Sequence, residues 1–87
     1  MDIKSNEILF TSWDKDDTLH IQLEPEAIIF KLMPGNEILF EGFGHDFYWA
    51  LRYCKDGFIQ LFPEGKQVYE INVYENSVLL EDWYKYM

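Results

Sequence analysis

The chain has 87 residues, 48% of them hydrophobic and 18% aromatic, which suits one domain with one core and excludes a disordered segment. Its formal net charge is −9, which argues against direct binding to nucleic acid or to an anionic membrane surface. Cys54 is the single cysteine, so no internal disulfide forms, and we recognise neither a signal peptide nor an apolar run of membrane-spanning length. We expect one reduced, cytoplasmic domain over residues 1–87.

Alternation of apolar and polar residues predicts β-strands along most of the chain. In residues 17–24, for example, Leu19, Ile21 and Leu23 share one face, and polar side chains occupy the other. Residues 66–74 alternate more weakly, because both faces are partly apolar. The expected strands lie near residues 6–13, 17–24, 27–33, 36–43, 46–54, 57–62, 66–74 and 77–86.

Turn residues separate these strands. Pro34-Gly35 suits a type II turn, Asp56-Gly57 suits a two-residue hairpin, and a further tight turn is expected over residues 62–65. Connections this short favour antiparallel neighbours. The sequence therefore predicts an all-β fold, an antiparallel meander of seven or eight short strands that closes into a barrel or folds into a sandwich.

The C-terminal segment, residues 77–87, has two interpretations. Its aromatic content favours a strand, which is our expectation. Helical spacing is also present, because Leu80, Trp83, Tyr84 and Met87 would share one face of a helix.

One pentapeptide, NEILF, occurs at residues 6–10 and again at residues 36–40. A shift of thirty residues also aligns Ile29 with Ile59 and Gly35 with Gly65, while a third copy from Lys66 aligns faintly and then decays. We interpret this as a repeat of about thirty residues, each unit made of three short strands that cannot bury their apolar face alone. The repeat points to architecture and does not require a catalytic explanation.

Catalytic and metal-binding motifs are not recognised in the sequence. The two histidines, His20 and His45, and the lone cysteine show no metal-ligand spacing. The acidic run at residues 14–17 does not continue as a calcium-binding loop, which would need glycine at Leu19 and glutamate at Pro25. We therefore expect no enzymatic activity, no metal and no cofactor.

Candidate binding residues are acidic or aromatic. Trp13 abuts an acidic loop, and tryptophan is a frequent anchor of protein interfaces, although packing of Trp13 into the core is an equal alternative. Further carboxylates follow the polar face of residues 17–24, and we expect them to share one acidic face if the fourth strand lies beside the first three. The candidate protein-binding residues are Trp13, Asp14, Asp16, Asp17, Glu24, Glu26 and Glu41.

The composition favours an inhibitor that binds a basic protein, such as an immunity protein to a nuclease-like toxin or a phage-type mimic of DNA, because opposite charge speeds the encounter. Two alternatives stay open. One is a small barrel that holds a ligand among its aromatic side chains. The other is an accessory β domain that associates with a partner strand or forms a homodimer.

Overall fold

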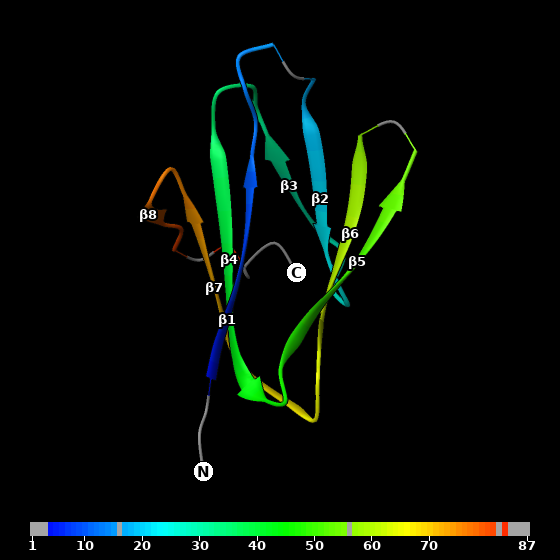
Figure 1. Cartoon of the computed structure of the whole chain (residues 1–87), viewed down its shortest axis with the longest axis vertical. Helices are drawn as coiled ribbons and strands as arrows, with labels where there is room; N and C mark the ends of the chain where they lie inside the picture. The colour runs from blue at the N-terminus through cyan, green and yellow to red at the C-terminus, as the bar shows by residue number, and fades with distance from the viewer. Residues whose placement is uncertain (1–3, 16, 56, 82, 84–87) are drawn as a thin grey trace.

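The computed structural model describes residues 4–15, 17–55, 57–81 and 83, and these form strands joined by turns and short loops (Figure 1). No helix among them is long and apolar enough to cross a membrane. The all-β prediction is confirmed. The strands are β1 (Lys4–Thr11), β2 (Leu19–Leu23), β3 (Ile28–Leu32), β4 (Glu37–His45), β5 (Tyr48–Cys54), β6 (Phe58–Glu64), β7 (Gln67–Glu75) and β8 (Val78–Leu79).

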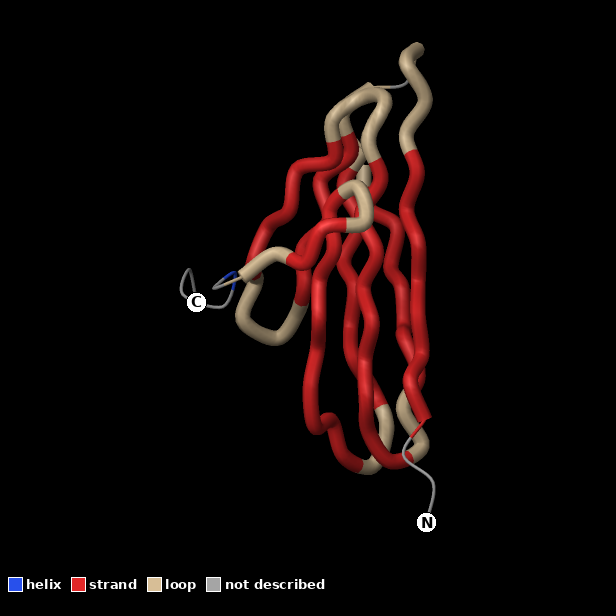
Figure 2. The backbone as a smooth tube through the Cα atoms, turned by 90° about the vertical axis from the view of Figure 1, so that its left-hand side faces the viewer, coloured by secondary structure: helices blue, strands red, loops and turns tan. Residues whose placement is uncertain are grey.

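Two four-stranded sheets pack against each other as a sandwich (Figure 1). Sheet A has the strand order β1-β4-β7-β8, and Figure 2 looks onto it. Sheet B has the order β3-β2-β6-β5. All neighbouring strands are antiparallel except β2 and β6, which run parallel. The sheets do not close into a barrel, so the sandwich is the correct alternative of the two predicted.

The thirty-residue repeat corresponds to a structural unit that places one strand in sheet A and one hairpin in sheet B. The first unit contributes β1 and the β2–β3 hairpin, and the second contributes β4 and the β5–β6 hairpin. The third begins with β7 in sheet A and then departs from the pattern, because β8 stays in sheet A. Meander connections are thus limited to hairpins, and elsewhere the chain crosses between the sheets.

The two copies of NEILF lie side by side in sheet A. They run antiparallel and are centred on Leu9 opposite Leu39, with Glu7 opposite Glu41. Ile and Phe of each copy point into the sandwich, where Ile38 and Phe40 are fully buried. The same alternation turns Glu and Leu of each copy outward.

A single core fills the space between the sheets, with Phe40 at its centre. Phe40 is fully buried, and the rings of Phe10, Phe30 and Trp49 meet it edge-on at centroid distances of 5.9, 5.3 and 6.2 Å. Edge-to-face contacts of this kind add to the stabilisation from burial alone. The other fully buried side chains are Ile21, Leu23, Leu32, Ile38, Leu61 and Val73.

β1 and β5 are edge strands on the same side of the sandwich, and they are joined near one end only. Asn6 Nδ2 donates a hydrogen bond to Phe47 O at 2.8 Å, and Trp49 Nε1 donates one to Asn6 O at 3.0 Å. Phe47 packs over Gly42, where a Cβ atom would overlap its ring. No strand pairing joins β1 to β5 among the described residues.

Several local predictions can be compared with the structure. The type II turn is confirmed, because Asn36 N donates to Met33 O at 3.2 Å and Gly35 has a φ of 86°. The predicted turn over residues 62–65 is displaced, because β6 continues through Pro63 to Glu64. β2 pairs with β6 only as far as Leu61, so the side of β6 that faces β2 is unpaired at Pro63. The missing backbone N–H of a proline is tolerated at such a position.

The C-terminal strand is much shorter than expected. Among the described residues after Glu75, Val78 and Leu79 pair, with Glu75 and Tyr74 respectively, to form β8, and residues 80, 81 and 83 are not in a strand. Trp83 then packs against Phe30 at a ring-centroid distance of 5.9 Å. Asp16, Asp56, Tyr84 and Met87 lie outside the described residues.

A candidate binding face on sheet A

The outward-facing side chains of β1, β4 and β7 form a surface that we call the acidic face. Pairing of the three strands places Glu7, Glu41 and Asn72 in one row across the sheet. The next row holds Leu9, Leu39 and Tyr74. The carboxylates of the acidic face are Glu7, Glu37, Glu41 and Glu70. None of the outward positions described on these three strands is lysine or arginine.

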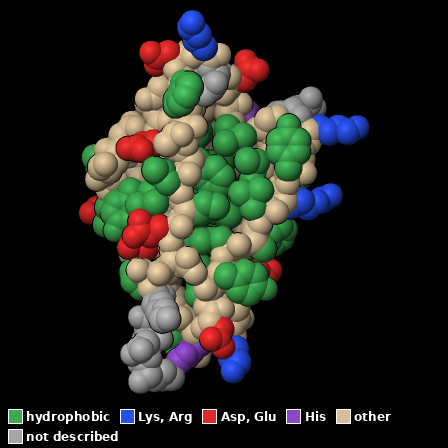
Figure 3. Space-filling view, viewed as in Figure 1, with side chains coloured by type: hydrophobic (Ala, Val, Ile, Leu, Met, Phe, Trp, Pro, Cys, Tyr) green, Lys and Arg blue, Asp and Glu red, His purple; other side chains and the backbone are tan. Residues whose placement is uncertain are grey.

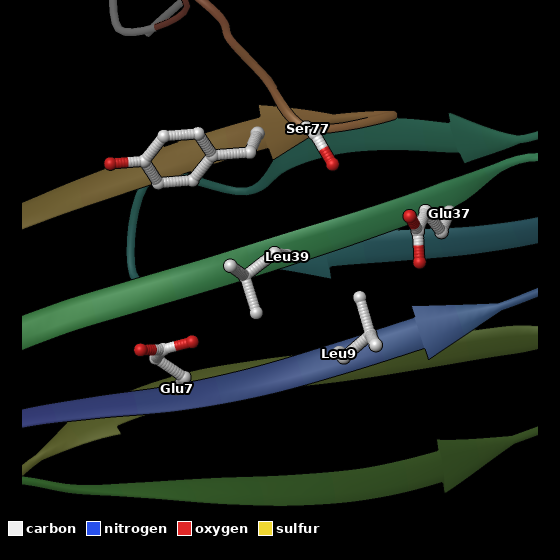
Figure 4. A pocket seen from close by; sticks show the side chains of 6 residues that line it. Glu7, Leu9, Glu37, Leu39 and Ser77 are labelled. Atoms are coloured by element: carbon white, nitrogen blue, oxygen red, sulfur yellow. The ribbon is translucent and has the colours of Figure 1, made fainter.

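The acidic face is hollowed over its apolar centre. A shallow depression of about 440 Å³ is lined by Leu9, Leu39 and Tyr74, with Glu7, Glu37 and Ser77 around them. Figure 4 shows the two leucines between Glu7 on one side and Glu37 on the other. Leu9 is 53% exposed, which is high for a leucine inside a strand. The surface thus offers an apolar centre with a charged rim, as protein interfaces do.

Polar contacts hold the carboxylate of Glu41 in place. Tyr74 Oη donates a hydrogen bond to Glu41 Oε1 at 3.2 Å, and Asn72 Nδ2 donates to the same oxygen at 3.5 Å. Desolvation, then the charge and hydrogen bond of Glu41, and then the charges of Glu7 and Glu70 raise the pKa of Tyr74 above its ordinary value. The phenol therefore keeps its proton and remains a donor to Glu41 at neutral pH.

Tyr74 should give the protein a pH dependence in the alkaline range. Its raised pKa means that the folded protein still binds the phenolic proton where the unfolded chain has lost it, so stability falls as the pH rises above about 10. We expect Tyr74→Phe to reduce this fall, and urea unfolding at several pH values measures it. Glu41→Gln should reduce it in part, because it removes one cause of the shift. Identical slopes in all three proteins would contradict the assignment.

The predicted binding residues are not gathered on one face. Trp13, Asp14 and Asp17 lie in the loop between β1 and β2, whereas Glu24 and Glu26 lie in the turn at the opposite end of β2. Glu41 belongs to the acidic face. The expectation of a shared face assumed that the fourth strand lies beside the first three, but β4 pairs with β1 and β7 in the other sheet. Asp16 lies outside the described residues.

The β1–β2 loop is anchored where it begins. Ser12 N donates to Asn36 O at 2.9 Å, and Gly35 N donates to Ser12 O at 3.0 Å, which ties the loop to the β3–β4 turn. Asp14 lies against this turn, because a Cβ at Gly35 would come within 2.9 Å of Asp14 Oδ1. Trp13 is 77% exposed, so the alternative that it packs into the core is wrong.

The two histidines are involved in ring contacts. His20 stacks on Phe58 on the outer side of sheet B, and His45 meets Tyr69 edge-on, at centroid distances of 6.2 and 5.5 Å. Within the described part of the chain, no three histidine, cysteine or carboxylate side chains come together as metal ligands would.

Charge is distributed unequally over the two outer surfaces. The outer side of sheet B carries Lys31 and Arg52, and Arg52 Nη1 donates to Gln60 Oε1 at 2.8 Å. The acidic face has no described lysine or arginine at its outward positions. At the strand positions of the acidic face, four carboxylates are thus not balanced by any described lysine or arginine, so the local potential of this surface is negative.

Sequence reasoning missed Glu7, Leu9, Leu39 and Tyr74 as members of one surface. The signal was present in NEILF, because alternation that buries Ile and Phe must turn Glu and Leu outward. The pairing of the two copies with each other was needed to join them.

No family model, curated protein or solved structure matches this chain.

Proposed function

We propose that the protein is a small inhibitor that neutralises a basic protein by covering it with the acidic face. The observation that carries this proposal is the composition of that face: Glu7, Glu37 and Glu41 lie around an apolar centre, and Glu70 lies further along β7 on the same face. A nuclease-like toxin or another nucleic-acid-binding enzyme is the kind of partner it fits, because such proteins present a basic surface to phosphates. The protein then acts as an immunity protein or as a mimic of DNA.

Two parts of the face have separate roles in this proposal. The carboxylates attract the basic partner over distance and raise the association rate. Leu9, Leu39 and the ring of Tyr74 then bury apolar area in contact, which slows dissociation. The inhibitor works in the cytoplasm, where Cys54 stays a free thiol.

The alternative hypothesis of a ligand-binding barrel has little support, because the two sheets do not close into a barrel around a shared interior. Large side chains, with Phe40 at the centre, occupy the space between the sheets. Three depressions over the described residues are open to solvent. Protein binding through a surface therefore has better support than enclosure of a small ligand.

Affinity capture with three matched baits tests the proposal. The baits are the unaltered protein, Glu7→Lys with Glu41→Lys on the acidic face, and Asp14→Lys with Asp17→Lys in the β1–β2 loop. We expect one basic protein to bind the unaltered and loop-altered baits, to elute as salt rises, and to be lost from the face-altered bait. The purified partner should also lose its activity when the unaltered protein is added.

Two outcomes would reject this function. If the face-altered bait retains the same partner as the other two, the acidic face is not the interface. If the captured partner is acidic or neutral, charge complementarity does not guide binding.

A further inference from the structure

β5 forms an unprotected edge of sheet B. It spans seven residues and, among the described residues, pairs with a strand only on the side of β6. The backbone N–H and C=O groups on its other side have no strand partner in the described part of the chain. Arg52 is its one charged residue. Proteins usually block such an edge with charges, proline, a bulge or a short strand, and β3 at the opposite edge has five residues and contains Lys31.

The core-facing side of β5 is also incompletely covered. Leu51 lies opposite the fully buried Leu61, and Tyr53 lies opposite Ile59, so both side chains point to the core side of sheet B. Leu51 is nevertheless 47% exposed and Tyr53 73% exposed. Among the described residues, the hydrogen bond that joins β1 to β5 is made at Trp49, to Asn6 O. Figure 3 shows the resulting hydrophobic surface on the side of the sandwich where β1 and β5 form the edges.

The charge around β5 differs from that of the whole chain. Between Asp46 and Asp56 the sequence contains Arg52 and Lys55 and no acidic residue, although the chain carries a formal charge of −9. Two copies of so acidic a protein repel each other over most of their surface. Along β5 itself no carboxylate adds to this repulsion, so the repulsion between two copies is weakest at this edge.

We propose that β5 pairs with β5 of a second copy of the chain, antiparallel and centred on Leu51. In this register Leu51 lies opposite Leu51 of the second copy, Trp49 opposite Tyr53, and Ala50 opposite Arg52. The aromatic pair and the leucine pair lie on the core side, and each long arginine faces a small alanine, so no like charges stand directly opposite each other. The backbone edges become paired, and the two copies of sheet B form one continuous eight-stranded sheet.

This dimer does not depend on the proposed inhibitory function. Sheet B carries the contact, and the acidic face on sheet A remains open in both copies. A failure to dimerise would leave the binding of a basic partner untouched, and the reverse also holds.

Sedimentation equilibrium over a range of protein concentrations tests the dimer. We expect the unaltered chain to dimerise, and Leu51→Lys to weaken the dimer by roughly tenfold or more, because it places two ammonium groups opposite each other. The matched control is Ile29→Lys, since Ile29 is 54% exposed on the other edge strand of sheet B and should leave the dimer intact. A chain that stays monomeric at every concentration, or equal weakening by both variants, would overturn the proposal.

Cross-linking tests the register without relying on a destabilising variant. In a Cys54→Ser background, Leu51→Cys places two thiols directly opposite each other, with Cα atoms about 5 Å apart, so a short bismaleimide should link the copies. The native Cys54 is the control, because the register separates the two Cys54 residues by six positions, or about 20 Å. Linkage through Cys54 but not through position 51 would refute the register.

Discussion

Replacing Phe40 with alanine should lower the free energy of unfolding by about 3–5 kcal/mol, the loss typical of a large buried aromatic side chain. Phe40 is fully buried and contacts three other rings, from Phe10, Phe30 and Trp49, which belong to both sheets. Truncation leaves a cavity where the sheets meet. Since domains of this size are stable by only about 5–15 kcal/mol, a substantial unfolded population is expected. Urea unfolding followed by tryptophan fluorescence measures the change.

A matched control exists on the same strand. Phe43 points to the outer side of β4, so Phe43→Ala removes an equal side chain without opening the core. We expect its cost to be clearly smaller. Phe40→Leu should retain most of the stability, because it refills much of the volume. Equal losses for Phe40→Ala and Phe43→Ala would contradict the position of Phe40 at the centre of the core.

Reversing charge on the acidic face should have the largest effect on association with a basic partner. For Glu7→Lys combined with Glu41→Lys, we expect the association rate at low salt to fall by roughly 10- to 100-fold. The two carboxylates lie directly opposite each other on β1 and β4, so both reversals act at one point of the surface. Stopped-flow mixing with the purified partner at several salt concentrations gives the rates.

The β1–β2 loop provides the control for net charge. Asp14→Lys with Asp17→Lys changes the formal charge of −9 by the same amount as the double reversal on the face. A much smaller effect of the loop variant would assign the steering to the acidic face. If both variants slow association equally and high salt removes both effects, overall charge acts and the location of the carboxylates does not matter. If the loop variant lowers the association rate more than the face variant does, the interface includes Asp14 and Asp17 and not the acidic face.

Local features of the fold were accessible from the sequence because they depend on neighbouring residues. Alternation identified which residues form strands, and Pro34-Gly35 identified a turn, since these properties follow from backbone geometry within a few positions. The neighbours of each strand could not be obtained in this way. Period-two alternation tells which face is buried, but it contains no information on which strand lies alongside, so the partition of β1, β4 and β7 into their own sheet was not foreseen.

The candidate site was missed for the same reason. Asp14 and Asp17 were chosen as binding candidates because they are close together in the sequence, but they lie in a loop and not on the acidic face. Glu7 and Glu41 are 34 positions apart and become neighbours only through the pairing of β1 with β4. Tyr74 joins them from β7. The repeat offered the one sequence signal for this surface, since its two copies present the same outward residues.

The strand order also governs how the chain folds. β2–β3 and β5–β6 are hairpins whose strands are close in sequence, so they can form early and by themselves. β1, in contrast, pairs with β4, which follows about thirty residues later in the sequence. The second strand that pairs with β4 is β7, which comes later still. On a ribosome, the first strand therefore emerges well before the strand that will shelter its apolar residues. Since unpaired strands of this kind attract other chains, slow synthesis or a truncation before β7 should favour aggregation over folding.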